Sequence, residues 1–471
     1  MVGRVLNPSR KGRQNYAAMK AARKFAGHNN RFPSPVRTIV CKCLFIVAAI
    51  ISCLAPVAAW AEPLTLADGL KIVTEENRLV RIRQQEEKMS HADTLVARSR
   101  LLPRVSASYG QTFLEHQPGV IFDSAAAPTA EKSYYTYQLM IQQILYDFGA
   151  AGSLYQAAKL TEDTKRLEAK RTRNAVALDF SVLYFDALES EKLIIVAETE
   201  VGSLESHVQV ATNLYHNGLI TKNDLLQATV RLADARQKLL TAQNIRKING
   251  ARLNNMLTRP LSIPIEVVEV TRPYPDMLPY EEAADIAEKE RPELQIADAT
   301  LQALKYEETA KKSEYLPKFL IQGQYDYTKN KYLTYEDNTG LSVLMNLNLF
   351  NGGSTKAEVQ KVQTAQSRLR IERKKLSDEI GLELEKYYLD TVNARERIRV
   401  AKGAISQAEE NLKITRLKYA EGVGIATDVT DAIALRTLSE TNYYRALYDY
   451  YRSEAGYLYA MGKNLKEKYG R

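Results

Sequence analysis

Cysteine and tryptophan are almost missing from the sequence, which excludes several kinds of site. The 471 residues include three cysteines and one tryptophan, all within residues 1–61. The rest of the chain cannot form a disulfide or bind a metal through sulfur, and it contains no glycine-rich phosphate-binding loop or nucleophile elbow. We interpret His91, His207 and His216 as surface residues, because they lie in polar helix-forming stretches without a second metal ligand at suitable spacing. The sequence therefore predicts neither an enzyme nor a bound cofactor.

Acidic residues are missing from the first part of the chain. Residues 1–61 hold ten Lys or Arg residues and no Asp or Glu, whereas the remaining 410 residues carry 55 basic and 56 acidic side chains. The formal net charge of +9 therefore comes from this leader alone. Because the rest of the chain is close to neutral, its charge does not predict a nucleic-acid partner.

The leader, residues 1–61, has the pattern of a secretory signal peptide with an extended basic region. An apolar stretch from Cys43 to Ala59 is followed by Ala59-Trp60-Ala61, a small-x-small cleavage site. A retained transmembrane anchor is the alternative, but the stretch is shorter than about 18 residues and contains Pro56. Lipidation at Cys53 is a further alternative, because Ile50-Ile51-Ser52-Cys53 resembles a weak lipobox and an acyl chain would anchor the protein.

Two long stretches lack proline and contain little or no glycine. Residues 153–201 contain neither, residues 354–421 contain only two glycines, and no proline follows Pro317. Both stretches are rich in Ala, Leu, Glu, Lys and Arg, which favours helix. Helices of this length exceed a globular core, so they must pack lengthwise against other helices.

The sequence repeats itself at a separation of 204 residues. Tyr215, Gly218, Asp224 and Ala228 recur as Tyr419, Gly422, Asp428 and Ala432. Each long stretch stops at Tyr-x-x-Gly, where glycine suits a left-handed helix end, and resumes within a few residues at Asn, Asp or Thr, which cap helices. This pattern predicts two helical hairpins with tight tips.

The repeat divides the chain into five segments. Residues 1–61 are the signal peptide, and residues 259–280 are a proline-rich connector between the halves. The first repeat, 62–258, comprises a helix near 66–100, a strand hairpin at 103–146 and a helical hairpin at 150–258. The second repeat, 281–462, comprises a helix near 281–314, a strand hairpin at 317–350 and a helical hairpin at 354–462, followed by a polar tail at 463–471.

Four short segments change their hydrophobic period from 3.6 to 2, which predicts amphipathic strands. Their apolar positions are Val105, Ala107, Tyr109 and Phe113; Tyr135, Tyr137, Leu139 and Ile141; Phe319, Ile321, Tyr325 and Tyr327; and Leu341, Val343, Met345, Leu347 and Leu349. The pattern is typical of outer-membrane barrel strands, and a sheet covering a soluble core is the alternative. A barrel needs at least about eight strands and tolerates no open edge in lipid, so several chains would have to share it.

With its duplicated halves, strand hairpins and long helical hairpins, the chain resembles the TolC family of outer-membrane efflux and secretion channels. Two further segments support the resemblance: Glu290–Leu294 is similar to the family's Asn-Pro-x-Leu, and Leu349–Gly353 is similar to its Leu-Phe-Asp-Gly-Gly. The resemblance covers nearly all of residues 62–462. It implies a mainly helical protein with a transmembrane β portion, in which four strands from each of three chains close a 12-stranded barrel.

The resemblance also implies the function and the partners. A homotrimer would stand in outer-membrane lipid, with its helical tunnel projecting into the periplasm, and would export substrates of a tripartite efflux pump or type I secretion system. Its partners would be a periplasmic adaptor, also called a membrane fusion protein, and an inner-membrane pump or ABC transporter. The alternative, a periplasmic coiled-coil adaptor or scaffold of an export complex, is less favoured because adaptors carry one helical hairpin and this chain has two.

Several roles at the tips follow from the resemblance. Asp428 and Asp431 match two aspartates of the family's periplasmic entrance, where carboxylate rings would favour cations; alternatively, Asp428 only caps a helix. Asp224 and Tyr419 match residues of the closed gate. Gly424 stands where the family has the arginine of that gate, so Lys222 or another basic tip residue would replace the link, or the entrance is held shut differently.

The outermost tip residues match the surface on which the family docks its adaptor. These residues are Gly218, Leu219, Gly422, Val423 and Gly424. Small residues allow close approach of another helix, although the glycines are equally explained as helix caps.

Overall fold

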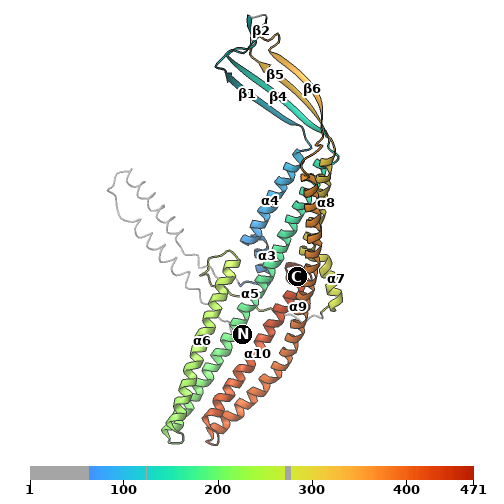
Figure 1. Ribbon diagram of the computed structural model, residues 1–471. Coiled ribbons are helices and arrows are strands. Elements are labelled where there is room, and N and C mark those ends of the chain that lie inside the picture. Colours follow the sequence, from blue (N-terminus) through green and yellow to red (C-terminus); the bar gives the residue numbers. More distant parts are fainter. Residues whose placement is uncertain (1–62, 123–124, 271–276, 471) are drawn as a thin grey trace, which may run out of the picture. The chain divides into compact units, whose positions relative to one another are not determined.

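Long helices dominate the computed structural model of the chain, which confirms the predicted mainly helical fold (Figure 1). The structure describes residues 63–122, 125–270 and 277–470, which belong to one structural unit. The predicted signal peptide, the alternative anchor and Cys53 lie outside the described residues. Within the described ranges, no helix is long and apolar enough to cross a membrane.

Two helical hairpins form the long part of the fold. Helices α5 (Ala150–His216) and α6 (Lys222–Met256) make the first, and α9 (Ser354–Ala420) and α10 (Ala426–Ala460) make the second. Helices α5 and α9 each have 67 residues, so each is about 100 Å long. Helix α5 packs against α6 and α10 as well as against shorter helices, so the two hairpins share contacts along their length (Figure 1).

Shorter helices precede the strands in both repeats. They are α3 (Leu66–Glu76) and α4 (Arg78–Ser99), then α7 (Tyr280–Glu290), α8 (Pro292–Lys312) and the 3-10 turn η1 (Ser313–Tyr315). A single helix was predicted in each place, and the structure divides both. Asn77 ends α3 and caps α4, its side chain accepting the Leu79 N–H at 2.9 Å. The second break falls at Arg291, because Pro292 disfavours a helical conformation at the residue before it.

The C-terminal segment is not the polar tail that its composition predicts. It contains the short helix α11 (Leu465–Tyr469), which contacts α3, α5 and α10. The side chains of Leu465 and Tyr469 are buried in the same hydrophobic cluster as residues of α3, α5 and α10. The prediction failed because two apolar residues among charged neighbours leave no periodic signal in so short a segment.

Four antiparallel strands form one sheet. They are β1 (Arg104–Phe113), β4 (Ser133–Tyr146), β5 (Lys318–Thr328) and β6 (Asp337–Asn346), in the order β1-β4-β5-β6. A separate pair, β2 (Gly119–Phe122) and β3 (Ala125–Pro128), lies in the connection between β1 and β4. Leu347 and Leu349 were predicted in the last strand but lie beyond its end. The ladder stops at the pair Lys318 and Asn346, because Pro317 has no N–H to extend it.

The strand register places the apolar positions of all four strands on one face. Tyr109 pairs with Tyr137, and Tyr137 pairs with Tyr327. Directly opposite residues share a face, and so do alternate residues of a strand. The tyrosine rings touch across the strands, with centroids 5.2 Å apart for Tyr109 and Tyr137 and 6.0 Å apart for Tyr137 and Tyr327. The face is uncovered, since Leu341 is 75% exposed and Val343 67%.

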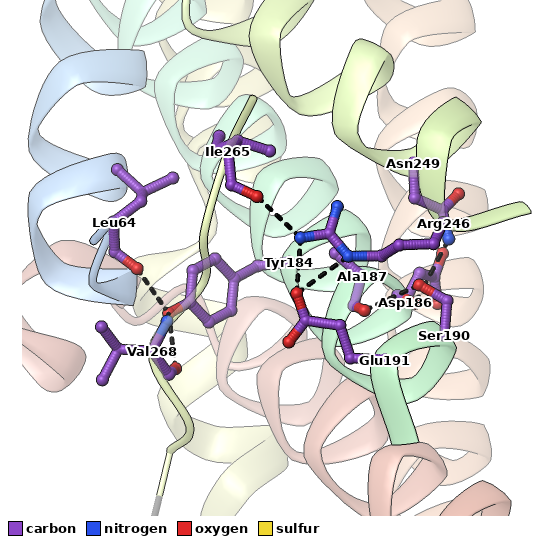
Figure 2. A network of polar contacts seen from close by, with 10 residues as sticks. All are labelled: Leu64, Tyr184, Asp186, Ala187, Ser190, Glu191, Arg246, Asn249, Ile265 and Val268. Carbon is purple, nitrogen blue, oxygen red and sulfur yellow. Dashed lines mark hydrogen bonds and ion pairs between the residues drawn. The ribbon is translucent and has the colours of Figure 1, made fainter. Parts of the chain in front are cut away.

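A polar network at the middle of α5 attaches the first described residues and the connector to that helix (Figure 2). The Tyr184 hydroxyl lies 2.7 Å from the Val268 carbonyl oxygen and 2.9 Å from that of Leu64, and it accepts the Val268 N–H at 3.0 Å. Leu64 and Val267 form a parallel bridge beside it. Arg246 of α6 donates to Glu191 at 2.8 Å and to the Ile265 carbonyl at 2.7 Å. The connector is thereby held against both helices of the first hairpin.

Candidate functional site at the helical tips

Both hairpins end in the same kind of glycine turn. Gly218 (φ 72°) and Gly422 (φ 77°) adopt the left-handed conformation that the sequence predicts for them. The N–H of Gly218 donates to the Tyr215 carbonyl at 2.9 Å, and that of Gly422 donates to the Tyr419 carbonyl at 3.1 Å. A side chain with a β-carbon would be strained at either glycine, so these turns explain why the glycine recurs in both repeats.

The helices that leave the two tips begin differently. Thr221 caps α6 with a capping box, in which its hydroxyl accepts the Asp224 N–H at 3.3 Å and the Asp224 carboxylate accepts the Thr221 N–H at 3.1 Å. Ile425 stands at the same position before α10 and provides no side-chain cap. Asp428 lies in the first turn of α10, where a negative charge is favourable at the positive end of the helix, but it makes no capping hydrogen bond. Asp428 and Asp431 are both exposed.

Asp224 and Tyr419, which the family resemblance places at the gate, lie near each other without a hydrogen bond between them. Tyr419 is only 3% exposed, and its hydroxyl has no hydrogen-bond partner among the described residues. Burial and the nearby Asp224 carboxylate both raise the pKa of the Tyr419 hydroxyl. The Asp224 carboxylate instead accepts the Thr221 hydroxyl at 2.8 Å. In this structure the Asp224 carboxylate is therefore part of the cap at the start of α6.

Within the described part of the chain, no basic side chain forms an ion pair with Asp224, the aspartate that the resemblance places at the gate. Lys222 is exposed at the start of α6 and makes no ion pair with a described residue. Gly424 packs closely on the end of α9: a β-carbon there would lie 3.0 Å from the Tyr419 nitrogen and 3.2 Å from the Lys418 carbonyl carbon. An arginine at this position would require the loop to shift.

His207 is buried beside Tyr419, contrary to its prediction as a surface residue. It is 4% exposed, its Nε2 has no hydrogen-bond partner among the described residues, and its ring centroid lies 5.1 Å from that of Tyr419. Burial, and then the positive charge of Arg416, lower the pKa of His207. Leu204, His207 and Ala211 lie on one helix face at spacings of three and four, and this pattern could have revealed the burial.

Apolar side chains remain uncovered at the outermost points of both tips. Leu219 is 68% exposed, Val423 75% and Ile425 62%. Behind them, a hydrophobic cluster joins α5, α6, α9 and α10 through residues such as Leu204, Leu232 and Val429. The tips are thus anchored by a shared core and present apolar residues outward.

Three comparisons relate the chain to known proteins. A family model described as outer membrane efflux protein matches residues 70–259 and 283–463, which include both repeats. The proteases secretion protein PrtF of Dickeya chrysanthemi is 21% identical over 407 residues, covering 81% of this chain and 86% of that protein.

Solved structures share the fold. A membrane protein from Pseudomonas aeruginosa superposes with a TM-score of 0.77 at 16% identity, covering 85% of this chain and 91% of that one. The outer membrane protein VceC from Vibrio cholerae superposes with a TM-score of 0.76 at 15% identity, covering 85% of this chain and 96% of that one.

Proposed function

The chain belongs to the outer membrane efflux protein family, and from this membership and the two-faced sheet we infer that it is the outer-membrane channel of an export system. The single observation that carries the proposal is the apolar face of the four-stranded sheet, which is uncovered on every strand. An apolar surface of this extent needs a membrane or a partner. The opposite face bears mainly polar side chains, as the lining of an aqueous conduit would.

The dimensions of the sheet suit a membrane. Strand β4 has 14 residues, and at about 3.3 Å per residue with a tilt of about 40° it rises about 35 Å. Tyrosines lie near both ends of its apolar face: Tyr135 and Tyr137 at one end, and at the other Tyr146, which a β-bulge after Ile144 places opposite Phe319. Aromatic residues prefer the two membrane interfaces, and the strand between them is long enough for an apolar band of about 25 Å.

The open edges of the sheet support a trimer. Within the described residues, β1 and β6 each pair on one side only. An unpaired edge is excluded from the interior of a membrane, so β6 of one copy would pair with β1 of the next. Three copies would supply 12 strands, with the apolar face toward lipid and the polar face inward. The helical hairpins would then surround one axis as a tunnel in the periplasm.

The tips would be the periplasmic entrance and the contact surface for other components. Exposed Leu219 and Val423 would dock a periplasmic adaptor, which links the channel to an inner-membrane pump or ABC transporter, and Asp428 and Asp431 would form carboxylate rings. The relative from Dickeya chrysanthemi is named for protease secretion, which favours a polypeptide cargo and type I secretion over drug efflux. A periplasmic adaptor remains the less favoured function, because the uncovered sheet face has no use in one.

A matched pair of variants tests the proposal. Val343→Arg places a charge on the apolar face, where an arginine at mid-membrane costs about 2–4 kcal/mol in each copy, whereas Ser342→Arg places it on the polar face one residue away. We expect the purified wild-type chain to form a detergent-dependent trimer that conducts in planar bilayers. Ser342→Arg should retain both properties and Val343→Arg should lose membrane insertion. A water-soluble monomer, or equal insertion of both variants, would contradict the proposal.

A further inference from the structure

Two basic residues lie at the base of the polar face of the sheet. Arg104, the first residue of β1, pairs with Gln142 of β4, and Gln142 pairs with Gln322 of β5. Lys318 is four residues from Gln322 on the same strand, and β5 has no bulge between them. Because paired residues and alternate residues share a face, Arg104 and Lys318 point to the same side, opposite to the apolar face.

A third basic residue joins these two around one cavity. Arg100 directly follows the last residue of α4, just before β1 begins. Arg100, Arg104 and Lys318 all line a cavity of about 390 Å³ between the base of the sheet and the first turns of α5. The cavity therefore lies where the strands meet the long helices.

The positive charge of this cavity is not neutralised within the described part of the chain. The side chains of Arg100, Arg104 and Lys318 are exposed and make no hydrogen bond or ion pair with a described residue. Asp147 is the one carboxylate in the lining, and its Oδ2 accepts the Ala151 N–H at 2.8 Å at the start of α5. By contrast, Arg452 elsewhere in the structure forms ion pairs with three carboxylates, those of Asp186, Glu189 and Asp449.

The face of the sheet on which Arg104 and Lys318 lie indicates whether they would contact lipid or the interior of the conduit. Basic residues that bind lipid headgroups would have to share the apolar face, with Val105 and Phe319. Arg104 and Lys318 are the strand neighbours of those two residues and therefore point the opposite way. In the proposed barrel that direction is the interior of the conduit.

We propose that Arg100, Arg104 and Lys318 form a basic collar inside the conduit, which attracts acidic segments of an exported polypeptide as they pass from the tunnel into the barrel. The inference rests on the proposed channel function. Three copies of the chain would bring nine basic side chains and three Asp147 carboxylates to one level. A ring of one charge sign sets the sign of what a constriction favours, and a low-dielectric wall strengthens its field.

The collar would complement the entrance, where Asp428 and Asp431 carry the opposite charge. The two sites are separated by the 67-residue helices, or about 100 Å. An extended polypeptide of about 30 residues spans that distance, so one cargo chain can contact both sites, whereas a small anion cannot. The acidic entrance repels acidic segments, whereas the collar attracts them. The collar would therefore favour their movement from the tunnel into the barrel.

The test uses the full chain in planar bilayers with a KCl gradient and poly-L-glutamate as the probe. The triple variant Arg100→Gln, Arg104→Gln, Lys318→Gln should shift the reversal potential toward greater cation selectivity and raise the poly-L-glutamate concentration for half block by about tenfold. The charge-matched control Arg98→Gln, Lys132→Gln, Lys356→Gln removes exposed basic residues that do not line the cavity and should behave as the wild type. Arg104→Lys keeps the charge and should also retain both properties.

The outcomes separate the collar from the channel itself. If the wild type and the triple variant conduct with the same reversal potential and the same block, the collar is refuted and the channel function stands. If the wild type forms no channel, the proposed function fails, and the collar with it. Should the triple variant not insert, Arg104→Gln and Lys318→Gln are measured singly, each with about a third of the shift expected; no shift in either refutes the collar.

Discussion

The imidazole ring of His207 in α5 lies 5.1 Å from the phenol ring of Tyr419 in α9, centroid to centroid. Both side chains are buried, and neither His207 Nε2 nor the Tyr419 hydroxyl has a hydrogen-bond partner among the described residues. The contact joins the two helical hairpins close to their tips. An unsatisfied buried polar group costs about 1–3 kcal/mol, so this contact is easier to separate than the apolar packing around it.

Acidification should loosen this contact. The pKa of His207 is lowered below its ordinary value of 6.5, so an opened tip binds more protons than a closed one as the pH falls below about 6.5. The contact between His207 and Tyr419 is therefore fully stable above that pH, and it loses stability as the pH falls toward the lowered pKa of His207. Protonated His207 would face Arg416 and the Tyr419 ring, with the Asp224 carboxylate occupied by Thr221.

Spin labels can follow this opening, because the described residues contain no cysteine. With Leu219→Cys and Val423→Cys labelled, we expect the distance distribution to broaden between pH 7.5 and 5.5. His207→Gln should abolish the broadening, whereas the exposed His216→Gln control should retain it. Broadening of equal size in His207→Gln would show that another group is responsible.

Neutralising the entrance aspartates should reduce cation selectivity. Asp428→Asn with Asp431→Asn removes six charges from a trimer, and we expect the permeability ratio of potassium to chloride to fall about twofold or more. The ratio is obtained from reversal potentials in planar bilayers. Asp93→Asn with Asp285→Asn removes the same number of exposed charges from α4 and α7 and should leave it unchanged. An unaltered ratio in the first variant would disprove the carboxylate rings.

Adding the missing cap to α10 should stabilise the second tip. Ile425→Thr recreates the Thr-x-x-Asp spacing of Thr221 and Asp224, with Asp428 as the acidic partner. The expected gain is about 1 kcal/mol, so amide hydrogen exchange over residues 422–430 should slow about fivefold. Ile425→Val, which cannot accept a hydrogen bond, is the control. Equal exchange in the two variants would contradict the capping argument.

Removing the Tyr184 hydroxyl should destabilise the middle of the fold. Tyr184→Phe leaves the Val268 N–H without its acceptor, at a cost of about 1–3 kcal/mol, and should lower the midpoint of thermal unfolding. Tyr388 is the equivalent residue of the second repeat, and its hydroxyl makes no hydrogen bond with a described residue. Tyr388→Phe should therefore leave the midpoint nearly unchanged, and equal losses would argue against the network in Figure 2.

Local residue patterns were enough to predict the long helices, the glycine turns and the two faces of the sheet. Each of these depends on preferences that act within a few residues: the absence of proline from α5, the left-handed conformation at Gly218 and Gly422, and the alternation through Tyr135, Tyr137 and Leu139. The family resemblance could be recognised because these local signals occur twice in the same order. The break at Arg291 also had a local signal, Pro292, which the helical pattern around it concealed.

The burial of individual side chains and the clusters that they form depend instead on contacts between distant segments. His207 is buried because α9 supplies Tyr419, some 200 residues away. Leu465 and Tyr469 are buried because α3 and α5 cover them, and Arg100, Arg104 and Lys318 surround one cavity because the sheet joins both repeats. Burial and charge clustering depend on surfaces that come into contact only when distant segments pack. The hydrophobic periodicity of one segment carries no information about those contacts.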